Sequence, residues 1–313
     1  MNPMKKVPII IDADPGVDDA YAIAMAHACP MFDVRAITAV EGNVPAKFTR
    51  RNALYLAEKF GINCRVAYGA ELPLKKDYGR FASIVHGDEG LGSIQVDQLS
   101  LKPDPMPAWD VIYDESVRAQ GEMILLAVGP LTNIALALQH HPDLPKYIKR
   151  FYIMGGGLFG NVSRWAEFNI WVDPTAAKEV FEKMEVYMVG LNVTHQAAIT
   201  QEEFDAIIEI CSRTEKNKTL QELSTFSREN CKKQNTDNHI IHDAITVASI
   251  IDPGLIRFEP HSVWVEDDPK AENEGQTVVE DIPGKAPNCY VGMDIDRQKF
   301  LEMLKETCEF YNQ

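Results

Sequence analysis

The stretch Asp12-Ala13-Asp14-Pro15-Gly16-Val17-Asp18-Asp19 places four carboxylates within eight residues, directly after the apolar run Val7–Ile11. A short apolar run of this kind is typical of a buried strand. A Pro-Gly pair then turns the chain, and the last two aspartates begin a predicted helix, where free backbone N–H groups favour negative side chains. Helix capping accounts for one or two of the four. Because like charges held close together repel, the whole set indicates a hard cation such as Ca²⁺ or Mg²⁺, or a catalytic role.

β-rich and helical segments alternate after this stretch. Strands are expected at Val34–Val40, Met123–Val128, Phe151–Met154 and Val186–Val189, and helices at Asp18–Ala28, Pro45–Phe60, Leu131–His140 and Thr175–Lys183. Asp173 is the expected N-cap of the last helix, with Pro174 at its first position. The alternation predicts an α/β fold with a mainly parallel, Rossmann-like sheet and helices on both faces. Sites in such folds lie at the carboxyl ends of the strands.

The C-terminal third has a different pattern. Residues Gln201–Asp252 are mainly helical in character, Leu255–Ile295 contains three β-rich runs that can add extra strands to the sheet, and Asp296–Phe310 is a predicted closing helix. No segment is linker-like or repeated, so a single domain is expected over residues 1–313. The acidic stretch Glu266–Glu274 is expected to be a solvated loop.

Composition excludes several classes of protein. The 313 residues contain 31 Lys and Arg against 46 Asp and Glu, a formal net charge of −15, which argues against nucleic-acid binding and against docking on anionic membranes. The six cysteines are scattered without a CxxC pair and are expected to be reduced thiols that bind no zinc. We find no secretory segment and no membrane span in the sequence, and therefore expect a cytoplasmic location.

Two classes of enzyme begin with a strand followed by Asp-x-Asp. In a phosphatase of the haloacid dehalogenase type, Asp12 would be the nucleophile and Asp14 the general acid. That class also needs a late acidic pair in an apolar context, whereas Asp267-Asp268 lies in the polar acidic stretch. The phosphatase therefore stays as an alternative hypothesis, and the second class has more support.

Further motifs follow the opening one in a fixed order. They are Gly42-Asn43, His86-Gly87, Gly129-Pro130-Leu131-Thr132-Asn133, Met154-Gly155-Gly156-Gly157, Asn161, Glu167-Phe168-Asn169, Asp173-Pro174, Val193-Thr194 and His242-Asp243-Ala244. Together with Asp12–Ala20, this ordered set resembles the inosine-uridine-preferring nucleoside hydrolase family over most of the chain. The resemblance implies hydrolysis of the N-glycosidic bond of ribonucleosides such as uridine, cytidine and inosine, in nucleoside salvage.

The resemblance also implies a metal site and a general base. The positions that match the family's Ca²⁺ ligands are Asp14, Asp19, Asp243 and the main-chain carbonyl of Val128. In the family the ion also binds the ribose 2′- and 3′-hydroxyls and the attacking water, from which Asp14 would take a proton. Val128 departs from the usual threonine, which matters little to a ligand that is a main-chain carbonyl.

Other matching positions imply substrate contacts. Asp18, Asn161, Glu167 and Asn169 match ribose-binding residues, and Asn43 matches a site position near the metal, although it is also a plausible turn residue. Glu167 and Asn169 are two apart, so an extended segment would point both side chains the same way.

The resemblance also implies that two histidines, His242 and His86, contact the nucleobase. His242 precedes Asp243, and a histidine near its ordinary pKa can donate a proton to the departing base at neutral pH. His86 matches a second histidine that faces the base. Having both favours a nonspecific or pyrimidine-preferring enzyme over a purine-specific one. Trp165 and Trp171 are expected to pack in or near the core. Trp165 departs from the small residues usual at its position and could instead line the sugar or base pocket. His239 has no motif support and is expected at the pocket rim or surface.

The expected partner is a small-molecule ribonucleoside, without nucleic acid or membrane. The family forms homodimers and homotetramers, and we favour a tetramer. A non-catalytic nucleoside- or ribose-binding protein is the alternative from outside the enzymes, because binding needs no acid at His242.

Overall fold

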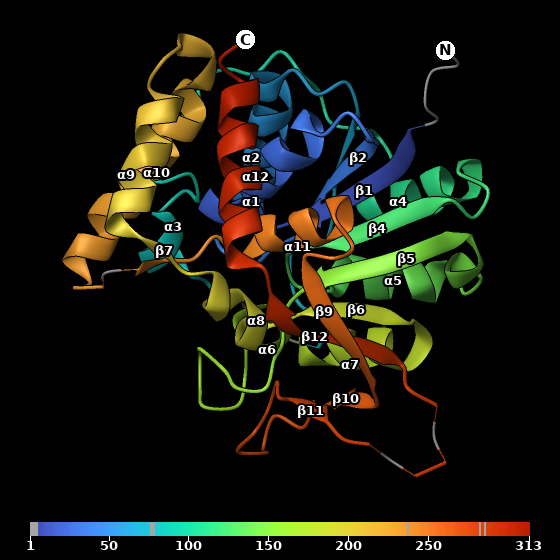
Figure 1. Ribbon diagram of the computed structural model, residues 1–313. Coiled ribbons are helices and arrows are strands. Elements are labelled where there is room, and N and C mark those ends of the chain that lie inside the picture. The colour runs from blue at the N-terminus through green and yellow to red at the C-terminus, as the bar shows by residue number, and fades with distance from the viewer. Residues whose placement is uncertain (1–5, 76–78, 237, 282, 285) are drawn as a thin grey trace.

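The apolar run that follows residue 6 forms a central strand, β1 (Val7–Ala13), which pairs in parallel with β2 on one side and β4 on the other. The structure is a computed structural model that describes residues 6–75, 79–236, 238–281, 283–284 and 286–313. Within these residues the main sheet has the order β3-β2-β1-β4-β5-β6-β12-β9 (Figure 1). Every pairing in it is parallel except that of β9 with β12. The predicted α/β fold with a mainly parallel sheet is confirmed.

The strands begin and end close to the predicted positions. Besides β1, the main sheet contains β2 (Phe32–Ala39), β3 (Arg65–Tyr68), β4 (Met123–Ala127), β5 (Ile148–Met154), β6 (Val186–Val189), β9 (Ile256–His261) and β12 (Cys289–Ile295). Two short antiparallel pairs lie outside it and are formed by β7 (Ile199–Thr200) with β8 (Asn238–His239) and by β10 (Val263–Val265) with β11 (Thr277–Val279). The C-terminal region thus extends the main sheet by two strands, and β10–β11 forms a separate hairpin at the bottom of Figure 1.

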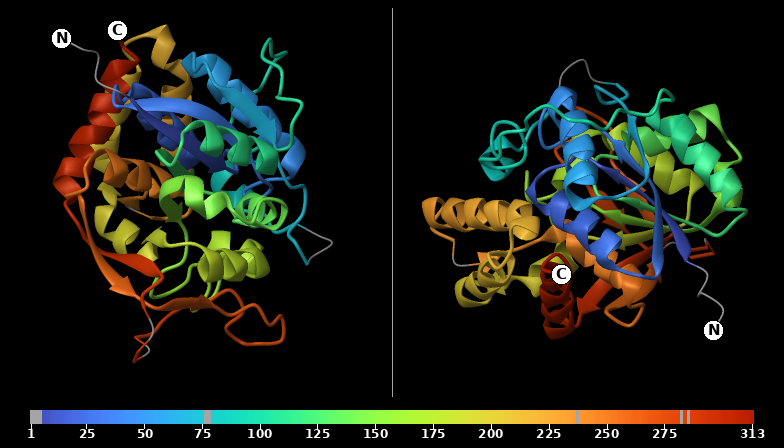
Figure 2. Two further views of the ribbon diagram at one scale, coloured as in Figure 1. Left: turned by 90° about the vertical axis from the view of Figure 1, so that its right-hand side faces the viewer. Right: turned by 90° about the horizontal axis from the view of Figure 1, so that it is seen from above.

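Helices cover both faces of the sheet (Figure 2). One apolar layer packs α1 (Val17–Ala28), α2 (Ala46–Phe60), α11 (His242–Ile251) and α12 (Arg297–Phe310) on one face. The other face is covered by α4 (Ala108–Arg118), α5 (Thr132–His140) and α7 (Pro174–Lys183). The carboxylate of Asp173 accepts a hydrogen bond from the Ala176 amide at 3.0 Å, which confirms it as the N-cap of α7.

Five further helices complete the α-helices of the described residues. They are α3 (Ser83–His86), α6 (Phe168–Val172), α8 (Leu191–Thr194), α9 (Gln201–Cys211) and α10 (Lys218–Lys233). Three 3₁₀ turns, Leu144–Tyr147, His195–Ala197 and Glu215–Asn217, complete the helical segments of the described residues. The six cysteines are free thiols, as expected. Among the described residues, no helix combines the length and the apolar character needed to cross a bilayer.

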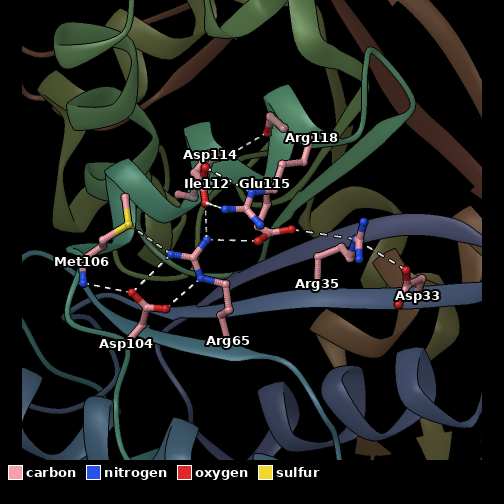
Figure 3. Close-up of polar contacts among 10 residues, drawn as sticks. Asp33, Arg35, Arg65, Asp104, Met106, Ile112, Asp114, Glu115 and Arg118 are labelled. Carbon is pink, nitrogen blue, oxygen red and sulfur yellow. Dashed lines mark hydrogen bonds and ion pairs between the residues drawn. The ribbon is translucent and has the colours of Figure 1, made fainter.

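The edge strand β3 is held by an ion network (Figure 3). The Arg65 guanidinium donates to Asp104 at 2.8 Å, to Asp114 at 2.5 Å and to Glu115 at 3.0 Å. The latter two acids belong to α4, so one side chain fastens β3 to the helix above it. Several charges that share one arginine stabilise more than an isolated surface pair does.

Candidate active site

Strands β1, β2, β4 and β5 run in parallel, so the motifs that follow them meet at one edge of the sheet. A pocket of about 420 Å³ lies there. The predicted residues that line it are Asp18, Asn43, His86, Val128, Asn161, Glu167, Asn169, His242 and Asp243. A larger groove of about 720 Å³ between α2, α10 and residues 93–99 contains none of the predicted site residues.

Asp14 and Asp19 are buried behind the pocket wall and are held by Asn43. The Asn43 backbone amide donates to Asp14 Oδ2 at 2.7 Å, and its side-chain Nδ2 donates to the Asp14 carbonyl at 3.1 Å and to Asp19 Oδ2 at 3.0 Å. Asp19 also accepts the amides of Asp14 and Gly16, at 3.2 Å and 2.8 Å. Asn43 is therefore more than a turn residue, because it fixes the positions of two carboxylates.

The buried carboxylates raise one another's pKa. Burial, followed by the negative charge of Asp19, holds the pKa of Asp14 well above its ordinary value. Burial and the charge of Asp18 raise the pKa of Asp19 to about 7. The pKa of Asp243 is also raised well above its ordinary range, by burial and by the charges of Asp18, Asp19 and Asp14. Such a cluster needs protons or a cation to offset its charge.

The donor atoms fit a hard cation. Carboxylate oxygens of Asp18, Asp19 and Asp243 lie within 4.8 Å of one another. Asp14 Oδ1 and Asp18 Oδ1 are buried and have no hydrogen-bond partner, which leaves both available as ligands. An all-oxygen set of this kind suits Ca²⁺ or Mg²⁺ rather than zinc. Asp18, expected only as a ribose contact, belongs to this cluster together with two of the three predicted carboxylate ligands.

Glu167 begins a helix rather than lying in an extended segment. Its carboxylate accepts the amides of Asn169 at 2.9 Å, Ile170 at 3.2 Å and Gly156 at 2.9 Å, and so caps α6. The extended segment predicted for Glu167-Phe168-Asn169 is therefore wrong, because capping offsets the cost of the free N–H groups at the start of a short helix. Burial raises the pKa of Glu167 to about 7.

Asn169 joins the ends of two neighbouring strands. Its Nδ2 donates to the Val128 carbonyl at 2.9 Å and to the Met154 carbonyl at 3.1 Å. The Val128 carbonyl, a predicted metal ligand, thus already accepts one hydrogen bond, and a carbonyl oxygen has a second lone pair for a cation. Asn169 therefore orients a predicted ligand as well as lining the pocket.

His242 is buried against α8. Its Nδ1 lies 2.9 Å from the hydroxyl of Thr194, so Nε2 is the ring nitrogen left for the pocket. Burial lowers the pKa of His242 to about 4, an effect that the charge of Asp18 only partly offsets. The ordinary pKa expected from the sequence is therefore not found, because the ring is buried away from water.

His86 has a defined tautomer. Its Nδ1 accepts the backbone amide of Val17 at 3.1 Å, so the neutral ring carries its hydrogen on Nε2. Asp18 Oδ1 is 3.7 Å from the same Nδ1. Burial lowers the pKa of His86. The ring is thus a neutral hydrogen-bond donor in this pocket.

The sequence did not identify several pocket residues. His239 is buried and stacks on Phe204 with ring centroids 4.0 Å apart, and Cys231 Sγ lies 3.3 Å from its Nδ1. All three line the pocket, whereas His239 had been expected at the rim or surface. No local motif marks it, because the pairing of β8 with β7 brings it there. Trp165 and Trp171 lie outside the residues that line the pocket.

Asp12 does not line the pocket and instead holds neighbouring side chains behind it. It is fully buried, and its Oδ1 accepts the Thr38 hydroxyl at 2.5 Å and Asn133 Nδ2 at 2.8 Å. Burial raises its pKa to about 7. A phosphatase nucleophile must reach its substrate, so this buried carboxyl argues against the haloacid dehalogenase alternative.

The fold and the pocket together define an α/β enzyme that binds a small polar ligand beside a cluster of buried carboxylates. The description of the family model that matches residues 9–302 is inosine-uridine preferring nucleoside hydrolase. The non-specific ribonucleoside hydrolase RihC of Escherichia coli (strain K12 / DH10B) is 37% identical over 306 residues, with 96% of this chain and 98% of that protein covered. The chain belongs to the inosine-uridine preferring nucleoside hydrolase family and is a ribonucleoside hydrolase.

Solved structures have the same fold. The plant nucleoside hydrolase PpNRh1 superposes with a TM-score of 0.89 at 31% identity, with 97% of this chain and 99% of that chain covered. The purine-preferring ribonucleoside hydrolase from Gardnerella vaginalis superposes with a TM-score of 0.91 at 28% identity, with the same coverage.

Proposed function

We propose that this protein is a Ca²⁺-dependent, nonspecific ribonucleoside hydrolase that cleaves uridine, cytidine and inosine to ribose and free base in nucleoside salvage. The observation that carries the proposal is the buried acidic cluster of Asp14, Asp19 and Asp243 beside a pocket that is also lined by His86 and His242. Cleavage of an N-glycosidic bond needs a deprotonated water, a stabilised sugar cation and a neutralised leaving group.

Asp14 is the proposed general base. Its Oδ2 is held by the Asn43 amide, whereas Oδ1 has no hydrogen-bond partner and is the oxygen that would take a proton from the attacking water. A base must be ionised to accept a proton, and burial among carboxylates opposes ionisation. A cation in the cluster would reverse that effect, and the donor set supports Ca²⁺. When bound, Ca²⁺ supplies positive charge that lowers the pKa of nearby water and favours ionised carboxylates.

The carboxylates of Asp18 and Glu167 would stabilise the positive charge that develops on the sugar. Asp18 and Glu167 both line the pocket, and the carboxylate of Glu167 is fixed by three backbone amides, so it needs no reorganisation during the reaction. Asn161 and Asn169 line the same pocket, and their amides suit the ribose hydroxyls.

We assign two histidines to the departing base, His242 to protonate it and His86 to hydrogen-bond to it. In protonated His242, Nδ1–H would donate to Thr194, and Nε2–H would be the proton given to the leaving base. Because its pKa is about 4, protonation at neutral pH requires the bound substrate to raise this pKa, against the positive charge of the cation, which opposes protonation. His86 would donate its Nε2–H to an acceptor atom on the base without changing its charge.

A broad base preference is supported by both histidines and by the identity to a relative whose name is non-specific ribonucleoside hydrolase. Purines and pyrimidines share ring acceptor atoms, so a single Nε2–H donor can bond to either. We also propose a cytoplasmic location, based on the six scattered free thiols, and a homotetramer, based on the family resemblance. Size-exclusion chromatography with light scattering tests the tetramer against the dimer.

The deciding experiment is a reducing-sugar assay on inosine, uridine and cytidine, with and without excess EGTA. We expect ribose release from all three and loss of activity or thermal stability after chelation, since a bound ion stabilises the native state. Asp14→Ala is the matched variant and should abolish release. Calorimetric binding of nucleoside without any ribose release would instead support the non-catalytic binding protein.

A further inference from the structure

Arg80 joins three segments that are distant in the sequence. Its guanidinium lies over the indole ring of Trp171, 3.7 Å from the ring centroid, and donates a hydrogen bond to the Trp171 carbonyl. It also donates to Glu274 Oε2 at 3.3 Å. Only 10% of the Arg80 side chain is exposed, so this contact is shielded from solvent far more than an ordinary surface ion pair.

The three segments contain different parts of the site and its surroundings. Arg80 belongs to residues 79–87, which we call the His86 loop. Trp171 belongs to α6, the helix that Glu167 caps and that contains Asn169. Glu274 belongs to the acidic stretch 266–274, which connects β10 to β11. The prediction that this stretch is a solvated loop is only partly right, because its Asp267 forms an ion pair with Lys178 at 2.6 Å. Arg80 therefore connects the loop with the histidine to the helix with the ribose-facing side chains.

The remaining anchors of the His86 loop hold it to other parts of the pocket. The Ala82 amide donates to the Asn43 carbonyl at 2.9 Å, and Asn230 Nδ2 from α10 donates to the Ile84 carbonyl at 3.0 Å. The Val17 amide donates to His86 Nδ1 at 3.1 Å and so orients the ring from α1. None of these bonds reaches α6. The hydrogen bond and the ring contact of Arg80 with Trp171 do relate the loop directly to α6.

We propose that Arg80 is a positioning residue that sets the distance between His86 and helix α6, and thereby makes recognition of the base depend on recognition of the ribose. The assignment rests on the proposed function, because it takes His86 to face the base. The glycosidic link fixes the separation of base and sugar in a nucleoside, so the groups that bind its two ends must be held at a matching separation. Arg80 itself touches neither end.

The test compares Arg80→Ala, Arg80→Lys and the control Lys178→Ala. The control removes one of the two α7 side chains that bond to Asp267, since Thr175 still donates to it at 3.3 Å, and it leaves the His86 loop attached. Three substrates are used: uridine, inosine and p-nitrophenyl riboside, which has no nucleobase for His86 to contact. We expect Arg80→Ala to lower kcat/KM for both nucleosides by about 10- to 100-fold, the usual cost of misplacing a group by about 1 Å, with less than about threefold change for the riboside. Arg80→Lys keeps the charge but not the flat stacking surface, so its loss of kcat/KM for the nucleosides should lie between those of wild type and Arg80→Ala.

Hydrogen exchange gives a readout that does not depend on activity. Amides of residues 79–87 should exchange faster in Arg80→Ala than in the wild type or in Lys178→Ala. Equal losses on nucleosides and riboside, a Lys178→Ala variant that reproduces the effect, or unchanged exchange in the His86 loop would each overturn the proposal. A wild-type protein that releases no ribose from any substrate would refute the proposed function instead, and the exchange data would still decide whether Arg80 holds the loop.

Discussion

Replacing Gly42 by alanine should inactivate the enzyme through one displaced carboxylate. A Cβ atom at Gly42 would lie 2.1 Å from Asp14 Oδ2, and ordinary van der Waals contact begins at 3.4 Å, so the carboxylate must move by about 1.3 Å. The backbone cannot move away instead, because the same Cβ would lie 2.8 Å from Pro130 Cδ. The shift breaks the 2.7 Å hydrogen bond from the Asn43 amide to Asp14.

The expected loss follows from this displacement. A catalytic group misplaced by about 1 Å costs about 100-fold, so kcat/KM for uridine and inosine should fall by at least that factor in Gly42→Ala. Overpacking of a core costs about 1–3 kcal/mol, so the protein should still fold with a lowered Tm. Ribose release measured by the reducing-sugar assay, together with a thermal melt, separates the two effects.

A matched control removes a different glycine. Gly254→Ala would place its Cβ 3.3 Å from the flexible side chain of Asp252, away from the pocket, and should leave kcat/KM within about twofold. Gly129→Ala would place its Cβ 2.6 Å from the other carboxylate oxygen, Asp14 Oδ1, and should reproduce the loss. A folded Gly42→Ala enzyme with activity within about threefold of wild type would refute the assignment of Asp14 as the base.

Three other perturbations test the remaining parts of the site. His242→Ala should slow natural nucleosides by about 100-fold or more but p-nitrophenyl riboside far less, because that leaving group needs no proton; equal losses would remove His242 from the acid role. Thr194→Val keeps the shape but removes the hydroxyl 2.9 Å from His242 Nδ1, and should lower kcat for uridine about tenfold with little effect on the riboside, as steady-state kinetics will decide. The stabilisation by Ca²⁺ should grow as pH rises from 5.5 to 8. In the folded protein Asp19 has a pKa of about 7, above its ordinary value of 3.8. Without Ca²⁺, the folded protein therefore binds more protons than the unfolded chain, and its stability falls as pH rises through this range. Bound Ca²⁺ displaces those protons and so removes this loss. Thermal melts with Ca²⁺ and with EGTA measure the difference, and a difference independent of pH would contradict proton competition at this cluster.

The parts of the site that follow strands could be predicted from the sequence. The Asp-rich stretch after β1, Gly42-Asn43 after β2 and Val128 after β4 converge because parallel strands end at one edge. This convergence needs only the strand pattern and the direction of the chain. The burial of Asp14 and Asp19 behind the pocket follows from the same arrangement.

The parts that depend on contacts between distant segments could not be predicted. The carboxylate that caps α6, Glu167, is also fixed by the Gly156 amide, eleven residues earlier, which no local pattern reveals. His239 becomes a pocket residue by stacking on Phe204. The low pKa of His242 reflects burial by the folded chain, so a sequence that indicates only the residue type suggests its ordinary value.

The acidic cluster draws its members from two separated parts of the chain, with Asp14 and Asp19 near the beginning and Asp243 in α11. A domain generally folds as a unit, so the cluster is complete only when α11, which carries Asp243, packs against α1, which carries Asp19. The repulsion among these carboxylates reaches its full strength at that step, and it is there that a cation from solution would contribute most to completing the fold.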